Sequence, residues 1–326
     1  MKLTTTGIAA SPPRRSSSFR LLAAGCLLAL AWTAVGGGTA RAATTLRWKL
    51  KPGEVLHYTM TQNTTNAYKP KDRQEASTAM SQVLNLHWTV KSISADGVAE
   101  VAQAVDRVQI RIEGAAQPSA FEFDSDAKLP PPESPIAAQL VPMLKALVGA
   151  EFTFKLNGRG ELSDIKVPEK LMESVRQANP GGGGSMFSDE GMKNLITQSG
   201  LTLSESALDP GKTWTQQSKL SLPMLGVMIL DKTYTFQGPD EAEAGRVKIA
   251  LDTKVAIQPA ADATITMKID SQGGKGVFSF DLERGRVVSS RVEDLLAMTL
   301  SVQGQEIGQT TKTVTEMKLS PEKTSK

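Results

Sequence analysis

The sequence predicts a mainly β protein of the β-rich α+β class. We expect two similar antiparallel sheet units, sandwich-like or half-barrel-like, with a few short helices. Three observations predict this class: apolar and polar residues alternate with a period of two, turn-forming pairs separate these runs, and landmarks of the first half recur in the second half.

The alternation is clearest in residues 83–90, 152–156 and 298–303. In each run every second residue is large and apolar, which is typical of an antiparallel strand with one buried face. Pairs such as Asp96-Gly97 and Asn157-Gly158 follow such runs, where hairpin turns favour glycine and asparagine. We therefore expect consecutive hairpins.

Three landmarks of the first half recur in the same order in the second half, which suggests an internal duplication. The pairs are Leu50–Glu54 with Leu208–Lys212, Trp88–Val90 with Tyr234–Phe236, and Phe152–Leu156 with Phe278–Leu282. We expect a first β unit over residues 43–166 and a second over residues 201–326. The sequence leaves open whether the two units share one continuous sheet.

Helices are expected mainly between these units. The strongest candidate spans residues 134–148, where an apolar stripe at helical spacing ends before a glycine, although Pro142 is expected to kink or divide it. A second candidate begins at Pro168, and a third short helix is expected over residues 189–198. Together with the glycine-rich run 181–185, residues 167–200 are expected to be a helical and flexible linker.

Residues 1–42 have the pattern of a cleavable secretory signal peptide. Five basic residues and no acidic residue accompany an apolar run from Leu21 to Val35, and an Ala-x-Ala site ends at Ala42. The apolar run is about 15 residues long, shorter than the roughly 20 that span a bilayer. We expect cleavage near Ala42 and an extracytoplasmic location: periplasm, cell envelope or secreted.

Two variants of this export signal remain open. Arg14-Arg15 loosely resembles a twin-arginine signal, so the sequence does not decide between the general secretory route and the twin-arginine route. Ala23-Ala24-Gly25-Cys26 resembles a lipidation site but lacks its branched residue, so lipidation of Cys26 also stays open. Before cleavage, the signal peptide is the expected contact with the membrane.

Removal of the signal changes the charge and the thiol content. The whole chain has 37 Lys and Arg against 34 Asp and Glu, and without the five bases of residues 1–42 the balance is 32 against 34, a net charge of −2. A slightly acidic chain gives no support for nucleic-acid binding. Cys26 is the only cysteine, so the expected mature chain has neither a disulfide nor a cysteine ligand.

The two histidines, His57 and His87, are each predicted on the strand face opposite the main apolar set. If their strands pair, the two imidazoles share a face, and a nearby carboxylate would complete a transition-metal site. No third ligand stands at a recognisable spacing, and hydrogen-bonded surface histidines are the commoner case. The sequence analysis therefore predicts no metal site and no cofactor.

No catalytic residues are predicted either. Ser185 follows a glycine run but lacks the second glycine of a nucleophile elbow, and no phosphate-loop lysine follows. Three carboxylate pairs stand near expected turns or strand ends, where solvated charge is the ordinary explanation: Glu241 with Glu243, Asp281 with Glu283, and Glu293 with Asp294. We expect no enzymatic activity, and a hydrolase with an unrecognised site is the remaining alternative.

Aromatic and methionine residues offer weaker hints of binding. Trp88 alternates with apolar residues and is expected in the core, whereas Trp48 and Trp214 are expected to seal sheet edges or to line a carbohydrate or lipid groove. The Met-rich stretch 222–230 is expected to form a buried, bulged strand or to line an adaptable apolar cavity.

The opening Leu46–Glu54 and the later Leu208-Asp209-Pro210-Gly211 repeat resemble an uncharacterised family of exported bacterial proteins with a signal peptide and a duplicated β region. The resemblance covers most of the expected mature chain. It implies an envelope or secreted location and no assigned activity, so it supplies no functional residues.

The expected function is that of a non-catalytic exported cell-envelope protein, a binding or scaffold module of unknown ligand. One alternative is a carrier that holds an apolar ligand or lipid in a half-barrel cavity against a helix. The expected partner is thus an unknown envelope protein or an apolar small ligand. The sequence does not indicate the oligomeric state.

Overall fold

The computed structural model describes residues 43–71, 74–114, 120–128, 134–178, 193, 196, 200–222, 226–260, 265–302 and 305–321. The chain divides into two units at residue 41, and all described residues belong to the second unit, residues 41–326. The fold described below is that of the second unit alone. The expected signal peptide lies outside the described residues, and so does nearly all of the expected third helix.

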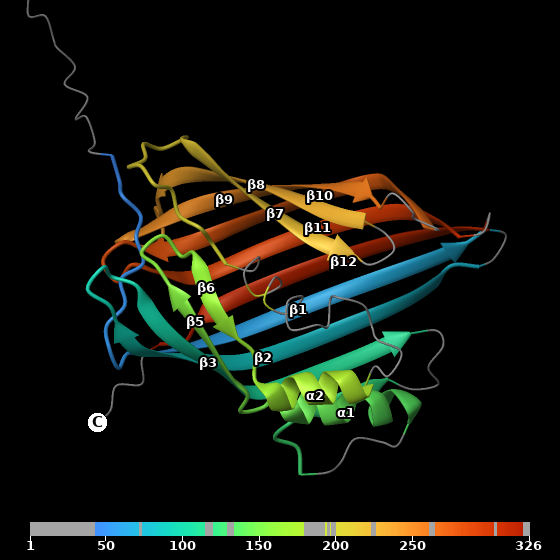
Figure 1. The fold of residues 1–326 in the computed structure, drawn as a ribbon. Coiled ribbons are helices and arrows are strands. Elements are labelled where there is room, and N and C mark those ends of the chain that lie inside the picture. Colours follow the sequence, from blue (N-terminus) through green and yellow to red (C-terminus); the bar gives the residue numbers. More distant parts are fainter. Residues whose placement is uncertain are drawn as a thin grey trace, which may run out of the picture. The chain divides into compact units, whose positions relative to one another are not determined.

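The second unit is built on one antiparallel sheet of twelve strands (Figure 1). In order along the sheet these run β6-β5-β3-β2-β1-β12-β11-β10-β9-β8-β7, and β4 pairs with β3 beside this path. The strands are β1 (Val55–Pro70), β2 (Ala76–Ile93), β3 (Ala99–Gly114), β4 (Phe121–Asp124), β5 (Glu151–Leu156), β6 (Leu162–Lys166), β7 (Thr213–Leu222), β8 (Gly226–Pro239), β9 (Arg246–Pro259), β10 (Ile265–Asp281), β11 (Arg286–Val302) and β12 (Gln305–Leu319).

The predicted mainly β class is confirmed, and the structure settles how the strands of the two halves are joined. The first strand pairs with the last, from Tyr58 opposite Leu319 to Pro70 opposite Ile307. Strands of both expected units therefore belong to one continuous sheet. The division of the chain into two similar units stays a prediction.

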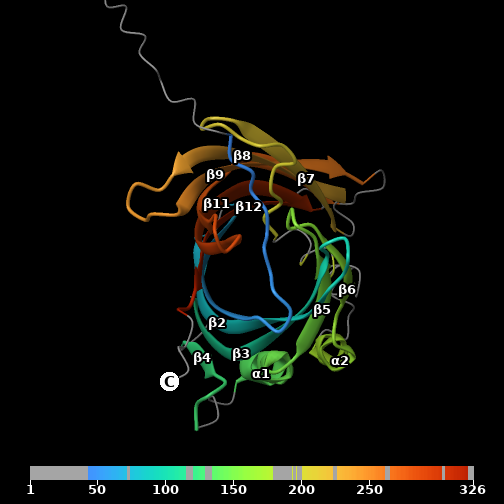
Figure 2. The same cartoon turned by 90° about the vertical axis from the view of Figure 1, so that its left-hand side faces the viewer.

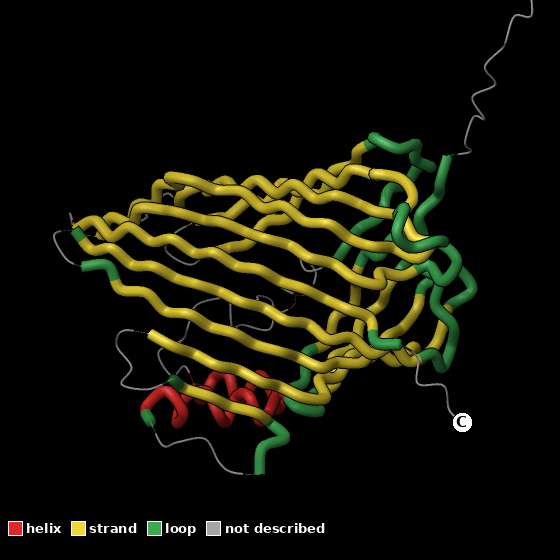
Figure 3. The backbone as a smooth tube through the Cα atoms, turned by 180° about the vertical axis from the view of Figure 1, so that it is seen from behind, coloured by secondary structure: helices red, strands yellow, loops and turns green. Residues whose placement is uncertain are grey.

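The sheet curls, as Figure 2 shows, so that its edge strands β6 and β7 lie on the same side of the view. We call the side that carries Tyr58 and Trp88 the inner face, because both rings pack there against residues from several strands. The opposite side is the outer face, and Figure 3 shows the strands running side by side across it.

In the part of the chain that the structure describes, two complete helices accompany the sheet, α1 (Pro135–Leu147) and α2 (Glu169–Ala178), as predicted for the first two candidates. The Ser134 hydroxyl caps α1 by accepting a hydrogen bond from the backbone N–H of Ala137 at 3.1 Å. Contrary to expectation, Pro142 does not divide this helix, which continues to Leu147. In the described part of the chain, both helices are too short to cross a bilayer.

The segment before β1 packs against strands from both halves of the sheet. Trp48 lies 5.9 Å from Trp88 of β2 and 6.2 Å from Phe280 of β10, measured between ring centroids. Trp214 stacks on Tyr234 at 5.3 Å. All four indole and phenol rings thus contribute to packing, so this end of the inner face is a filled core.

Candidate functional site

Away from that filled end, the inner face presents apolar side chains that are only half-buried. They lie on five strands, and none belongs to the apolar clusters formed by the described residues. They are Met228, Leu230, Val255, Ile257, Met267, Ile269, Leu296, Leu300 and Ile307.

Strand register aligns these side chains in rows on the inner face, and we call them together the apolar patch. Met267 stands opposite Leu300, which stands opposite Ile307, so three neighbouring strands contribute one row. Leu230 stands opposite Val255 in the same way on β8 and β9. Because paired residues of an antiparallel sheet project to the same side, the patch faces inward as a whole.

A polar row crosses the inner face beside the apolar patch. Lys232, Thr253, Gly274 and Asp294 are successive partners on β8, β9, β10 and β11. The Asp294 carboxylate leans over the glycine, since a Cβ at position 274 would stand 2.2 Å from its Oδ1. Glycine is needed here because the carboxylate occupies the volume of a side chain.

Both charges of this row are held in a poorly solvated setting. Desolvation raises the pKa of the Asp294 carboxyl, and Lys232 opposes this shift. Desolvation likewise lowers the pKa of the Lys232 amine, and Asp294 opposes that shift. Asp294 is nevertheless open to solvent by area. The raised pKa and the exposure of Asp294 agree, because water reaches a carboxylate on the concave side of a sheet although protein surrounds it.

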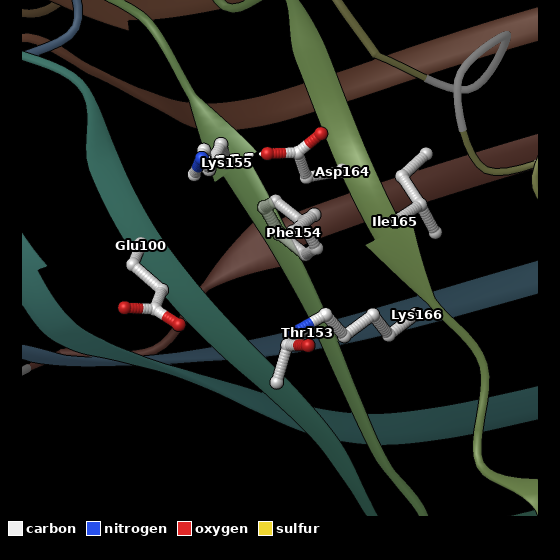
Figure 4. Close-up of a pocket in the computed structure, with 7 residues that line it drawn as sticks. All are labelled: Glu100, Thr153, Phe154, Lys155, Asp164, Ile165 and Lys166. Atoms are coloured by element: carbon white, nitrogen blue, oxygen red, sulfur yellow. Dashed lines mark ion pairs between the residues drawn. The ribbon is translucent and has the colours of Figure 1, made fainter.

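Several open hollows lie on the outer face, and charged side chains are among the residues that line them. One, of about 300 Å³, lies between β3, β5 and β6 and is lined by Glu100, Lys155 and Asp164, among others (Figure 4). In it Lys155 lies 2.6 Å from Asp164, and this hydrogen bond lowers the pKa of the Asp164 carboxyl. Such paired, solvated charges indicate an ordinary hydrophilic surface rather than a ligand site.

A larger hollow of about 610 Å³ lies over Gly273 on the outer face of β9 to β12. Charges of both signs line it, including Lys254, Lys275 and Glu293. Gly273 has no side chain, so its backbone forms the floor of this hollow. Because charges of both signs line it, this hollow favours neither anionic nor cationic ligands. It is therefore a less selective binding surface than the inner face.

The structure brings His57 and His87 together on the outer face. They are direct partners on β1 and β2, with ring centroids 5.7 Å apart. The Nδ1 atom of His87 lies 2.7 Å from Oδ1 of Asp106 on β3. Sequence reasoning predicted the shared face but missed Asp106, which stands 19 residues after His87 with no motif to mark it.

The three carboxylate pairs take positions that suit solvated charge. Glu243 lies in the β8–β9 turn, 3.4 Å from Arg246, and Glu293 lies 2.7 Å from Arg291. Asp281 ends β10, where its carboxylate accepts a hydrogen bond from the backbone N–H of Arg284 at 2.8 Å. Glu293 and Asp294 face opposite sides of β11, so they do not form an acid–base pair.

The remaining expectations fall partly outside the described residues. Ser185 is outside them altogether, so its role stays untested. Of the Met-rich stretch, residues 226–230 form the start of β8, half-buried, with Met228 and Leu230 on the inner face. This placement makes the stretch part of the apolar patch.

Comparison with known proteins gives a family but no activity. Among curated proteins, none matches the chain. One solved structure, titled "Lipid-protein interactions in lipovitellin", aligns with 84% of this chain at a TM-score of 0.48 and 11% sequence identity. The chain spans only 26% of the length of that protein. The profile of a family of unknown function, DUF6263, matches residues 96–286, more than half of the chain. The chain belongs to this uncharacterised family.

Proposed function

We propose that this protein is a non-catalytic extracytoplasmic binding protein and that its ligand is a lipid-like molecule held on the inner face of the curled sheet. The observation that carries the proposal is the apolar patch, nine half-buried apolar side chains on one concave surface. The proposed location, in the periplasm, envelope or outside the cell, rests on the signal-peptide pattern of residues 1–42.

Half-buried apolar side chains on a concave surface favour an apolar ligand for a simple energetic reason. Each 100 Å² of apolar surface that a ligand removes from water contributes about 2.5 kcal/mol. An isolated exposed leucine is ordinary, whereas a contiguous patch of this kind is typical of a binding surface. Met228 and Met267 add adaptability, because their unbranched side chains fit irregular partners.

The polar row gives such a ligand a defined orientation. Lys232 and Asp294 border the patch, so a ligand with an apolar chain and a polar head would place the head at the row. A desolvated carboxylate and amine form stronger hydrogen bonds than solvated ones. An amphipathic lipid therefore fits this surface better than a pure hydrocarbon does.

Hydrolysis is the weaker alternative for this chain. Both histidines lie on the outer face, away from the apolar patch, and the described hydrogen bond of His87 goes to a carboxylate. A serine nucleophile would need to reach one of these rings, and none does so among the described hydrogen bonds.

Lipid copurification tests the proposal directly. The protein, purified after expression of the full chain, is analysed by native mass spectrometry and by organic extraction, and its affinity for cis-parinaric acid is measured by fluorescence. We expect copurified lipid and saturable binding. Leu296→Asp, in the apolar patch, should abolish binding, because it places a charge where the apolar chain lies.

Val277→Asp is the matched control. Val277 stands on the outer face of β10 and is 43% exposed, so the same charge should leave the affinity unchanged. Circular dichroism checks that both variants are folded. Equal affinity for the two variants, or no lipid at all, would contradict the carrier and favour a scaffold that offers a sheet edge to another envelope protein.

A further inference from the structure

The outer face carries a second feature, a cluster of two imidazoles and one carboxylate, which the apolar patch does not involve. One nitrogen each of His57 and His87 and one oxygen of Asp106 lie within 4.8 Å of one another. They come from three adjacent strands, β1, β2 and β3. The side chains of His87 and Asp106 are 30% and 43% exposed, so the cluster is open to solutes.

Asp106 is the extra residue of a β-bulge beside this cluster. Asn85 and Leu86 are consecutive on β2, but their partners on β3 are Arg107 and Val105. Asp106 stands two residues after Ala104, the partner of His87, so alternation along β3 directs it to the outer face. There its carboxylate reaches His87, and bulges are common beside functional sites.

The cation next to Asp106 is paired with other carboxylates, so the Asp106 carboxylate is directed to the histidines. The adjacent cation, Arg107, is held by Asp124 at 2.6 Å and by Asp126 at 3.4 Å. The β3 residue opposite His87 is Ala104, whose methyl group does not crowd the imidazole. The local composition thus leaves two imidazole nitrogens and one carboxylate oxygen as metal donors on one face.

These donors suit a first-row transition metal. Imidazole nitrogen binds zinc, copper and nickel, and a carboxylate adds a charged oxygen ligand. Metal–ligand bonds of about 2.0–2.2 Å place tetrahedral ligand atoms roughly 3.4 Å apart. The cluster reaches this spacing through rotation of exposed side chains, while the paired strands hold the three Cα positions fixed.

We propose that His57, His87 and Asp106 form a binding site for a divalent first-row transition metal. Three protein ligands leave at least one coordination position for water or for a group of another molecule. A bound metal would also clamp β1, β2 and β3 together, because each strand supplies one ligand. The proposal does not depend on the lipid-like ligand, which would occupy the other side of the sheet.

Zinc titration tests this site. The purified full chain is stripped with a chelator and titrated with Zn²⁺ in competition with a chromophoric chelator. We expect one Zn²⁺ per chain at this site and a higher unfolding temperature with Zn²⁺ present, since a ligand of the native state stabilises it. The double variant His57→Gln, His87→Gln should lose both effects.

Asp106→Asn tests the carboxylate. The amide keeps the shape and can still hydrogen-bond His87, but it loses the charge. Loss of an outer-shell partner alone weakens metal affinity about 10- to 100-fold, so loss of a direct ligand should weaken it at least as much. Co²⁺ in place of Zn²⁺ reports the ligand set through its visible absorption bands, which should change in both variants.

The matched control is Asp252→Asn, which removes an exposed carboxylate from the outer face of β9. It should bind Zn²⁺ like the unaltered protein. Circular dichroism distinguishes lost ligands from lost fold. Absence of Zn²⁺ binding in the unaltered protein, or equal binding in the double-histidine variant, would overturn the site, and an unchanged Asp106→Asn would overturn the three-ligand assignment.

Discussion

The guanidinium of Arg286 lies 2.6 Å from the carboxylate of Glu54, and both side chains are largely removed from solvent. Arg286 begins β11, whereas Glu54 immediately precedes β1, so the pair connects segments 232 residues apart in sequence. Its surroundings include Tyr58, whose pKa is raised by burial while Arg286 opposes that shift. The pair thus fastens the segment before β1 to the middle of the sheet.

Glu54→Gln should lower the free energy of unfolding by about 3 kcal/mol, because it leaves the buried Arg286 charge without its counter-ion. Urea unfolding followed by tryptophan fluorescence measures this. Glu316→Gln is the control, since its partner Arg291 is exposed and the expected loss is small. Equal losses for the two variants would show that the Glu54 pair has no special role.

The docking of the same segment depends on Gly285. Its backbone has φ of 60°, and a Cβ there would stand 2.5 Å from Cγ of Lys49 and 2.6 Å from the carbonyl oxygen of Arg47. Gly285→Ala should therefore destabilise the protein by more than the roughly 1–2 kcal/mol that a left-handed conformation alone costs. Gly211→Ala is matched in φ, at 88°, but meets nothing within 4 Å, so it should show the backbone cost alone. Equal unfolding free energies for the two variants would contradict this.

Local patterns predicted the parts of the fold that depend on local sequence. The alternation around Trp88 predicted a strand, and Asn157-Gly158 predicted a hairpin turn. Both predictions involve only residues close in sequence. The pairing of Tyr58 with Leu319 is different, since the closing of a sheet depends on contacts between distant segments. No pattern in either strand specifies its partner, which is why one continuous sheet could not be distinguished from two.

The candidate sites, like the fold, were predictable from the sequence only where they depend on local patterns. Parity along one strand predicted that His57 and His87 would share a face if their strands paired. Asp106 joins them from the neighbouring strand β3, and no motif in the sequence marks it as the residue that reaches His87. The apolar patch could not be predicted from the sequence either, because half-buried and fully buried leucines give the same alternation along a strand.

Acid should weaken the attachment of β4. The carboxylate of Asp124 accepts two hydrogen bonds from Arg107, at 2.6 and 2.9 Å, and these lower its pKa. The carboxyl therefore titrates at lower pH in the folded state than in the unfolded chain, where its pKa is about 3.9. Its stabilisation is fully present well above pH 4 and is lost as the pH falls through the folded-state pKa.

Asp124→Asn should consequently be less stable than the unaltered protein at pH 7, and the difference should shrink as the pH is lowered below about 4, the ordinary carboxyl pKa. Urea titrations at several pH values measure the difference. Asp252→Asn, an exposed carboxylate without a described ion pair, serves as the reference. A pH-independent difference for Asp124→Asn would show that the ionised form carries no advantage.

Gly274 allows a sharp test of the polar row. A Cβ there would stand 2.2 Å from Oδ1 of Asp294 and 2.9 Å from Cβ of Thr253, so Gly274→Ala must displace the carboxylate. We expect a loss of about 1–3 kcal/mol in stability, as for other overpacked sites. If the row orients the head group of a lipid-like ligand, the affinity for cis-parinaric acid should also fall.

The adjacent Gly273 provides the control, because it lies on the outer face and a Cβ there meets nothing within 4 Å. Gly273→Ala should leave both the stability and the affinity nearly unchanged. A fall in affinity for both variants would indicate a general change in the sheet. A fall in stability without a fall in affinity for Gly274→Ala would show that the ligand does not contact the polar row, because the displaced Asp294 carboxylate belongs to that row.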